Sequence, residues 1–266
     1  MIARVLSIAG SDSGGGAGIQ ADIKTITALG GYAATAITAL TAQNTTGISA
    51  VIDVPADFIR KQIRAVLSDI GADAVKTGML SREDVIVAIA EELMSVAPSI
   101  PLVVDPVMVA KDGTRLLSKP ANDALKRDLC PMAAIITPNV PEAEELTGLT
   151  IRDVNNMRRA GEMLLSLGSK AVLVTGGHLD VDMIPNLLVT SDGEEVFTMT
   201  RVRTPHTHGT GCTLGSAIAT YLAQGQTLSR AVEQAVAYVG CAVEESPGLG
   251  RGQGPIAHVN SFSRRH

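Results

Sequence analysis

The sequence has 266 residues, a formal net charge of −5 and only 2% aromatic residues. It has neither the basic surface nor the stacking side chains that nucleic-acid-binding proteins use. No apolar run approaches the ~20 residues of a membrane span, so we expect neither nucleic acid nor a membrane as a partner. The three cysteines are scattered without disulfide or metal-site spacing, which favours a reduced, cytoplasmic location.

The first elements predicted are a strand, a glycine-rich turn and a helix. Residues 5–8 are apolar and stop before glycine, which is typical of a buried strand. Residues 14–18 are rich in glycine, and apolar residues then recur with helical spacing over 19–29. Asp22 falls within the apolar sector of this helix, where an acid needs a partner or a ligand. A favourable place in an early helical turn is the simpler explanation.

The next elements alternate between strands and helices. Residues 32–42 predict a strand that runs into a polar turn, 55–67 an amphipathic helix and 73–79 a second strand. A helix is expected to start near Ser81, and 102–108 predict a core strand that contains Asp105. The carboxyl ends of strands in doubly wound sheets form the ligand crevice, so Asp105 is a site candidate or a turn-forming Asp-Pro. Gln43 either hydrogen-bonds its own turn or contacts a ligand.

The second half continues the alternation. Residues 135–137 and 171–174 predict strands, and 153–167, 228–244 and a segment from Gly209 predict helices. Asp192-Gly193 between residues 186–190 and 195–202 is a hairpin signal. Asn139 and Glu142 have capping-box spacing, which alone would account for both. We therefore expect one three-layer α/β/α domain over residues 1–260 with a mostly parallel sheet, and a flexible tail over 261–266.

The stretch from Gly209 to Cys212 is the strongest local signal for chemistry. Its small residues open a helix, where unpaired N–H groups and the helix dipole make an anion site. Cys212 also allows a thiol nucleophile, with His208 four residues away. The sequence contains no G-x-G-x-x-G, no Walker loop and no G-x-S-x-G elbow. Anion binding and thiol chemistry therefore both stay open at this point.

Several stretches, taken together and in order, resemble the ribokinase-like small-molecule kinases, and among them the hydroxymethylpyrimidine/phosphomethylpyrimidine kinases of thiamine biosynthesis. They are Ile8-Ala9-Gly10-Ser11-Asp12, residues 14–22, residues 38–45, Lys76-Thr77-Gly78-Met79-Leu80, residues 105–111, residues 137–143, Gly176-Gly177-His178 and residues 208–213. The resemblance covers nearly the whole chain. It implies a ribokinase-like fold, ATP and Mg²⁺ as cofactors, a small pyrimidine as substrate and, as an option, a homodimer.

The resemblance also assigns roles to residues. It implies an anion hole for the transferred phosphoryl group, formed by Gly209, Thr210, Gly211 and Cys212. It implies a pyrimidine pocket of Ala9, Gly10, Asp22, Gln43, Met79, Val107 and Cys212. ATP contacts would come from Asp105, Lys111, Asn139, Thr175 and Gly177, and Mg²⁺ ligands from Asp105 and Glu142. A thiol at a helix N-terminus can reach the thiolate state near neutral pH, so Cys212 could accept the hydroxyl proton.

Two positions depart from the pattern of the family. Thr175 stands where the family commonly has a lysine that is expected to meet the ATP phosphates, a role that Lys111 could assume. His206 stands where the family often has asparagine.

We therefore expect a kinase that phosphorylates 4-amino-5-hydroxymethyl-2-methylpyrimidine and then its monophosphate. The rivals are a pyridoxal or pyridoxine kinase of the same fold, a thiol-nucleophile acyl-transfer enzyme using Cys212, and a non-catalytic pyrimidine sensor. Cys212 and the pair Asp22 and Gln43 argue against the pyridoxal kinase.

Overall fold

The structure is a computed structural model that describes residues 2–109, 113 and 115–263. Its strands are β1 (Arg4–Asp12), β2 (Tyr32–Asn44), β3 (Gly47–Asp53), β4 (Ala74–Thr77), β5 (Leu102–Val104), β6 (Ile135–Ile136), β7 (Ala171–Thr175), β8 (Met183–Thr190) and β9 (Gly193–Thr200). Its α-helices are α1 (Gly18–Ala28), α2 (Ala56–Asp69), α3 (Glu83–Val96), α4 (Lys119–Ala124), α5 (Val140–Thr147), α6 (Val154–Leu165), α7 (Thr210–Ala223) and α8 (Leu228–Glu244). A π-helical turn (Leu125–Leu129) and a 3-10 turn (Cys130–Met132) extend α4.

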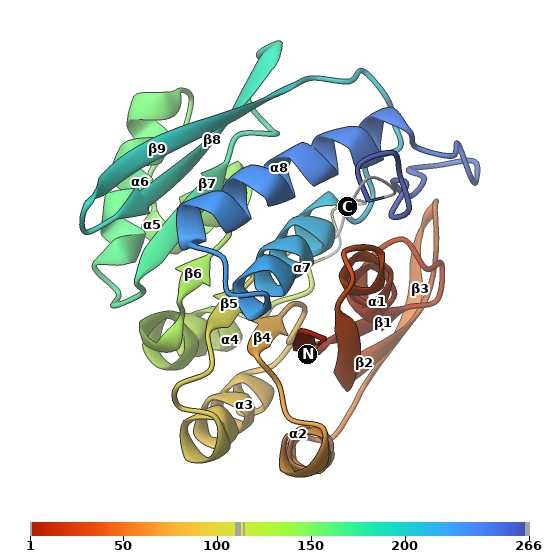
Figure 1. Cartoon of the computed structure of the whole chain (residues 1–266), viewed down its shortest axis with the longest axis vertical. Helices are drawn as coiled ribbons and strands as arrows, with labels where there is room; N and C mark the ends of the chain where they lie inside the picture. Colours follow the sequence, from red (N-terminus) through yellow and green to blue (C-terminus); the bar gives the residue numbers. More distant parts are fainter. Residues whose placement is uncertain (1, 110–112, 114, 264–266) are drawn as a thin grey trace.

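Within the described ranges, the strands form one sheet in the order β3-β2-β1-β4-β5-β6-β7-β8-β9 (Figure 1). The six central strands, β2 to β7 in this order, pair in parallel. Strands β3, β8 and β9 are antiparallel additions at the two edges. The predicted three-layer α/β fold with a mostly parallel sheet is confirmed.

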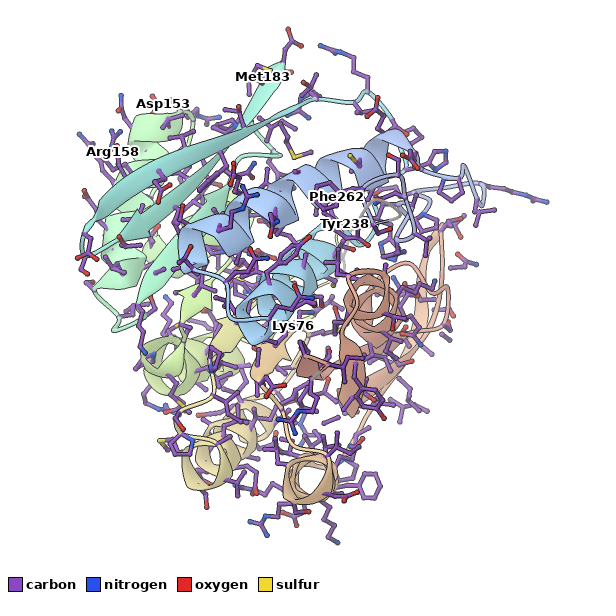
Figure 2. The ribbon with its side chains drawn as sticks, in the orientation of Figure 1. Lys76, Asp153, Arg158, Met183, Tyr238 and Phe262 are labelled. Carbon is purple, nitrogen blue, oxygen red and sulfur yellow. The ribbon has the colours of Figure 1, made fainter. Side chains whose placement is uncertain are left out.

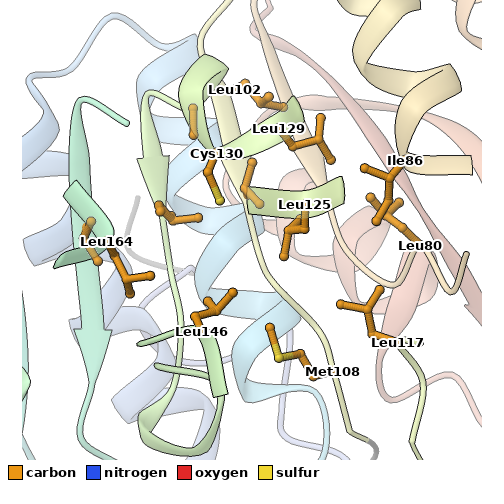
Figure 3. Packing of buried hydrophobic residues seen from close by; sticks show 14 of the residues in the cluster. Leu80, Ile86, Leu102, Met108, Leu117, Leu125, Leu129, Cys130, Leu146 and Leu164 are labelled. Carbon is orange, nitrogen blue, oxygen red and sulfur yellow. The ribbon is translucent and has the colours of Figure 1, made fainter. Parts of the chain in front are cut away.

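Both faces of the sheet are covered, and the central strands alternate strictly between the two cores. Leu102 and Val104 of β5 point into one cluster with helices α2 to α6, while Val103 points into the other with α1, α7 and α8. Figure 3 shows part of the first cluster, including Leu102, Leu125 and Leu129. Because parallel strands are buried on both faces, their sequences are continuously apolar, which explains why short apolar runs marked them correctly.

Several boundaries differ from the prediction. Strand β3 was not anticipated; it is an exposed edge strand with no alternation of buried residues. Strand β5 ends at Val104 instead of continuing to residue 108, and Pro106, which has no N–H, lies just after it. Helix α3 begins at Glu83 with Arg82 as its N-cap, because Ser81 takes a left-handed φ of 62°. The predicted hairpin at Asp192-Gly193 and the helix over 228–244 are confirmed.

The C-terminal residues lie against the domain as far as the structure describes them. The rings of Phe262 and Tyr238 meet edge to face with centroids 6.0 Å apart (Figure 2). The N–H of Ser261 donates to the carboxylate of Glu245. Residues 261–263 are thus held by contacts, while the rest of the expected tail, 264–266, lies outside the described residues. In the part of the chain that is described, no helix is long and apolar enough to cross a membrane.

Candidate active site

A cavity of about 800 Å³ opens where the carboxyl ends of the central strands meet the start of helix α7. It is lined by both glycine-rich segments and by the loops that follow β5, β6 and β7. Of the predicted site residues it brings together Gly10, Gln43, Met79, Asp105, Val107, Asn139, Glu142, Thr175, Gly177, Gly209, Thr210, Gly211 and Cys212. These residues come from seven separate stretches of sequence, so the fold gathers most of the predicted site.

The start of helix α7 has the geometry of an anion hole. Gly209 is its N-cap with a left-handed φ of 90°, and within the described part of the chain no side chain caps the helix. The first-turn N–H groups of a helix have no acceptor within the helix, and the dipole adds positive charge there. A Cβ on Gly209 would lie 1.8 Å from the carbonyl oxygen of Gly16, so the two glycine segments touch backbone to backbone. This position requires glycine.

An aspartate that the sequence reasoning did not single out ties these segments together. The carboxylate of Asp12 accepts hydrogen bonds from the N–H groups of Gly14, Gly16 and Ala17. Nε2 of His208 lies 2.8 Å from the same carboxylate and 3.5 Å from the side-chain nitrogen of Gln43. Burial opposes the charge on Asp12, but the hydrogen bonds from His208 and the backbone outweigh it and lower the pKa. Asp12 thereby fixes the first loop against the second.

The two predicted metal ligands lie close enough to influence each other. Burial raises the pKa of Asp105 to about 6, although the Lys76 ammonium opposes this. Burial and repulsion by Asp105 raise the pKa of Glu142 to about 8. Asn139 and Glu142 form the predicted capping box, and the roles of this pair toward ATP and Mg²⁺ stay predictions. Among the residues that the structure describes, one buried carboxylate oxygen of Asp105 has no hydrogen-bond partner, so it is a suitable ligand for a cation.

The donor set of this pair suits magnesium. Within the described ranges, His, Cys, Asp and Glu side chains form no group of three or more that could hold a metal ion. Mg²⁺ typically takes one or two carboxylates and completes its shell with water and phosphate oxygens. Asp105 and Glu142 fit that pattern.

The state of Cys212 differs from the expectation. Burial raises the pKa of its thiol to about 12, although Lys76 acts in the opposite direction. Loss of solvation thus opposes the expected thiolate and acts against the favourable position at a helix N-terminus. The half-buried Cys212 lines the cavity, and its role as a proton acceptor stays a prediction.

Two of the predicted pyrimidine contacts do not reach the cavity. Ala9 is fully buried in strand β1 and is not part of the lining. Asp22 is also fully buried, and its carboxylate accepts hydrogen bonds from Lys76, Ser7 and Ser216. The acid on the apolar face thus has protein partners and needs no ligand. Both assignments are corrected on this ground.

The cavity also contains an apolar chamber that sequence reasoning missed. Its walls come from the β8–β9 hairpin and from helices α7 and α8, and they comprise Ile184, Met199, Leu214, Val236, Val239 and Val243. The described lining includes no Phe or Tyr, so a flat base entering here would lie between aliphatic side chains. The sequence analysis did not single these residues out, because apolar helix and strand residues carry no signal that distinguishes a cavity wall from packing.

Two arginines line the cavity, whereas the sequence analysis expected a lysine, Lys111, to contact the ATP phosphates. Lys111 lies outside the described residues. Arg201 and Arg203 line the cavity, and Arg201 donates to the backbone carbonyls of Gly177, Leu179 and Val181. Arg201 therefore holds the loop that follows β7.

The unusual His206 anchors a glycine-rich segment near the C-terminal end. Its Nδ1 accepts a hydrogen bond from the N–H of Gly254, at 3.2 Å. The carbonyl of Gly254 accepts from the N–H of His208, and the N–H of Gln253 donates to the carbonyl of Thr45. This segment, residues 252–256, joins the β2–β3 turn to the loop that precedes the anion hole.

Comparison with known proteins agrees with this geometry. The model of the phosphomethylpyrimidine kinase family matches residues 12–257, which is most of the chain. The chain belongs to the phosphomethylpyrimidine kinase family.

Relatives within the family are close in sequence. The chain is 48% identical over 265 residues to the hydroxymethylpyrimidine/phosphomethylpyrimidine kinase of Rhizobium meliloti, covering 98% of this chain and 99% of the relative. It is 50% identical over 255 residues to a thiamine biosynthesis bifunctional protein of Geobacter sulfurreducens, covering 96% of this chain but 52% of that relative. The chain thus spans about half the length of the bifunctional protein.

Solved structures agree with the fold. The phosphomethylpyrimidine kinase of Clostridium difficile is 48% identical, with a TM-score of 0.79 over 89% of this chain and 97% of that one. An ADP complex of Bacillus subtilis pyridoxal kinase is 35% identical, with a TM-score of 0.91 over 98% of each chain. Members of the phosphomethylpyrimidine kinase family and a pyridoxal kinase therefore share this architecture.

Proposed function

We propose that the protein transfers the γ-phosphoryl group of ATP to the hydroxymethyl oxygen of 4-amino-5-hydroxymethyl-2-methylpyrimidine, and then a second one to the resulting monophosphate. In each step an oxygen–phosphorus bond forms at the acceptor oxygen, and the bond between the γ-phosphorus and its bridging oxygen breaks and releases ADP. The acceptor of the first step is a hydroxyl, which loses its proton, and that of the second step is a phosphate oxygen of the monophosphate. The observation that carries this proposal is the uncapped start of helix α7, which shares one cavity with an acid pair and an apolar chamber.

The residues of the anion hole, Gly209 to Cys212, have distinct roles in this reaction. The N–H groups of Gly211 and Cys212 stabilise the charge on the transferred phosphoryl oxygens, whereas the N–H of Thr210 already donates to the carbonyl of Thr207 at 3.4 Å. Phosphoryl transfer passes through a loose transition state that needs little covalent help, so positioning supplies most of the rate. Cys212, as a neutral thiol, orients the acceptor hydroxyl and is not a nucleophile. The thiol pKa of about 12 argues against the acyl-transfer alternative.

The acid pair and the chamber would serve the nucleotide. Asp105 and Glu142 would hold Mg²⁺ directly or through water, and the ion would neutralise phosphate charge. The base of ATP would occupy the apolar chamber, which leaves its phosphates near Asn139, Thr175 and Gly177. Gly10, Gln43, Met79 and Val107 would enclose the pyrimidine. A cytoplasmic location and a homodimer also stay predictions.

A coupled assay of ADP release tests the proposal. It supplies ATP, Mg²⁺ and either the pyrimidine, its monophosphate or pyridoxal, and mass spectrometry identifies the product. We expect turnover of the pyrimidine and of its monophosphate. Absence of turnover with both would refute the proposal, and tight pyrimidine binding without ADP release would indicate a sensor.

Pyridoxal phosphorylation is the second candidate, because the pyridoxal kinase fold superposes over 98% of the chain. A kcat/KM for pyridoxal that exceeds that for the pyrimidine would favour this alternative. A covalent adduct on Cys212 would support acyl transfer.

A further inference from the structure

A buried ion pair lies directly behind the anion hole. Lys76, which is labelled in Figure 2, lies on strand β4 and is fully buried. Its Nζ lies 3.0 and 3.1 Å from the two carboxylate oxygens of Asp22. Ser7 donates to one of these oxygens at 2.5 Å and Ser216 to the other at 2.7 Å. Each oxygen of Asp22 thus accepts two hydrogen bonds, which fixes the carboxylate and, through it, the ammonium.

Helix α7 approaches this pair through its glycines. A Cβ on Gly215 would lie 3.4 Å from Cε of Lys76 and 3.6 Å from Cβ of Asp105. A Cβ on Gly211 would lie 3.8 Å from a carboxylate oxygen of Asp105. The glycine face of the first two turns therefore lies against the lysine stem and the candidate metal ligand. Lys76 and the transferred phosphoryl group would lie on opposite sides of the same short stretch of helix.

Stability alone does not account for such a pair. Removing two charges from water costs several kcal/mol per ion, and apolar replacements of buried pairs are often equally stable. The ammonium has three hydrogens, and both of its hydrogen bonds within the described ranges go to Asp22. The other charged or ionisable groups that act on it are Asp105 and Cys212, both on the cavity wall. At both groups Lys76 has the larger effect and Asp22 the smaller, opposing one, so the positive end of the pair faces the cavity wall.

We propose that Lys76 is a positioning residue of the kinase: Asp22, Ser7 and Ser216 hold its ammonium behind the start of helix α7, where it stabilises negative charge that gathers at the anion hole during transfer. Lys76 neither gives nor takes a proton, and it does not touch the substrate. A fixed charge in a water-excluded site needs no reorganisation at the moment of reaction, which is the condition for strong electrostatic stabilisation. This inference rests on the proposed function.

The test removes both charges of the pair. The single variant K76M would leave Asp22 buried without a counter-charge and is prone to unfold. The double variant K76M/D22N is neutral and keeps similar shapes, so we expect it to fold. Its kcat should fall about 100-fold, while KM for ATP and for the pyrimidine changes by less than about threefold. The matched control is R4M/D73N, which removes the ion pair between Arg4 and Asp73 away from the cavity; its kcat should equal that of the wild type.

The outcomes separate the two proposals. A double variant that folds and keeps the wild-type kcat would show that the pair is only structural and would overturn this inference alone. A rise in KM without a fall in kcat would also overturn it, because a charge behind the anion hole acts on the transition state. A wild-type protein that fails to phosphorylate the pyrimidine and its monophosphate would refute the proposed function and this inference with it.

Discussion

Replacing Gly209 by alanine should disrupt the anion hole while the rest of the fold stays intact. Two costs arise at this position. The left-handed φ of 90° costs an L-residue about 1–2 kcal/mol. The new Cβ would also lie 1.8 Å from the carbonyl oxygen of Gly16, where contacts normally begin at 3.4 Å, so the two loops must separate by about 1.6 Å. A displacement of about 1 Å in a catalytic group can cost 100-fold in rate, so we expect at least that loss in kcat for G209A.

Gly225 offers a matched control just beyond the other end of helix α7. It has a similar φ of 80°, but nothing lies within 4 Å of the point that a Cβ would occupy. G225A should therefore lose only about 1 kcal/mol, which lowers Tm by roughly 2–4 °C, and keep the wild-type kcat. Calorimetry and the ADP-release assay measure both variants. If G209A kept kcat within a factor of three of G225A, the backbone contact with Gly16 would not shape the catalytic site.

Three further predictions concern ionisation. Because the thiol pKa of Cys212 is about 12, its alkylation by iodoacetamide in a C241S background should accelerate up to pH 10 without a plateau; a plateau near pH 7 would contradict this. Mg²⁺ with an ATP analogue should release about one proton at pH 7, because the cation favours the charged form of Glu142, whose pKa is about 8. E142Q, which preserves the capping box, should abolish that release in a pH-indicator assay. Burial lowers the pKa of His258 to about 4, below its unfolded value, so the contribution of this residue to stability is lost as pH falls; in urea unfolding, the stability of the wild type relative to H258Q should be about 2 kcal/mol lower at pH 5 than at pH 7.

The sequence was a good guide to the sheet because its central strands are buried on both faces. Short apolar runs such as residues 102–104 and 135–136 have no other stable place in an α/β fold. Edge strand β3 escaped prediction for the opposite reason. Its residues face solvent and follow a polar turn, so its only strong cue is pairing with β2, which a single sequence does not reveal.

The site was predictable where backbone geometry requires glycine and where strands end. Gly209 and Asp105 are examples, since each follows from a local rule. Asp22 shows the limit: the helical pattern correctly placed an acid on the buried face, but not its partner. Lys76 is 54 residues away, and only the pairing of β4 with β1 brings the two together. Long-range partners of this kind cannot be read from local spacing.

Residues 252–256 affect how the protein folds during its own synthesis on the ribosome. This segment supplies the acceptor for the N–H of His208 and the donor to Thr45, so both walls of the cavity depend on residues that are translated after the strands of the described sheet. Domains begin to fold while they emerge from the ribosome. The sheet can form early, and Asp12 can already hold His208, but the loop before Gly209 lacks its hydrogen bond to Gly254 until this segment arrives. A nascent chain stalled before Gly254 should therefore be folded in its sheet and bind an ATP analogue more weakly than the full chain.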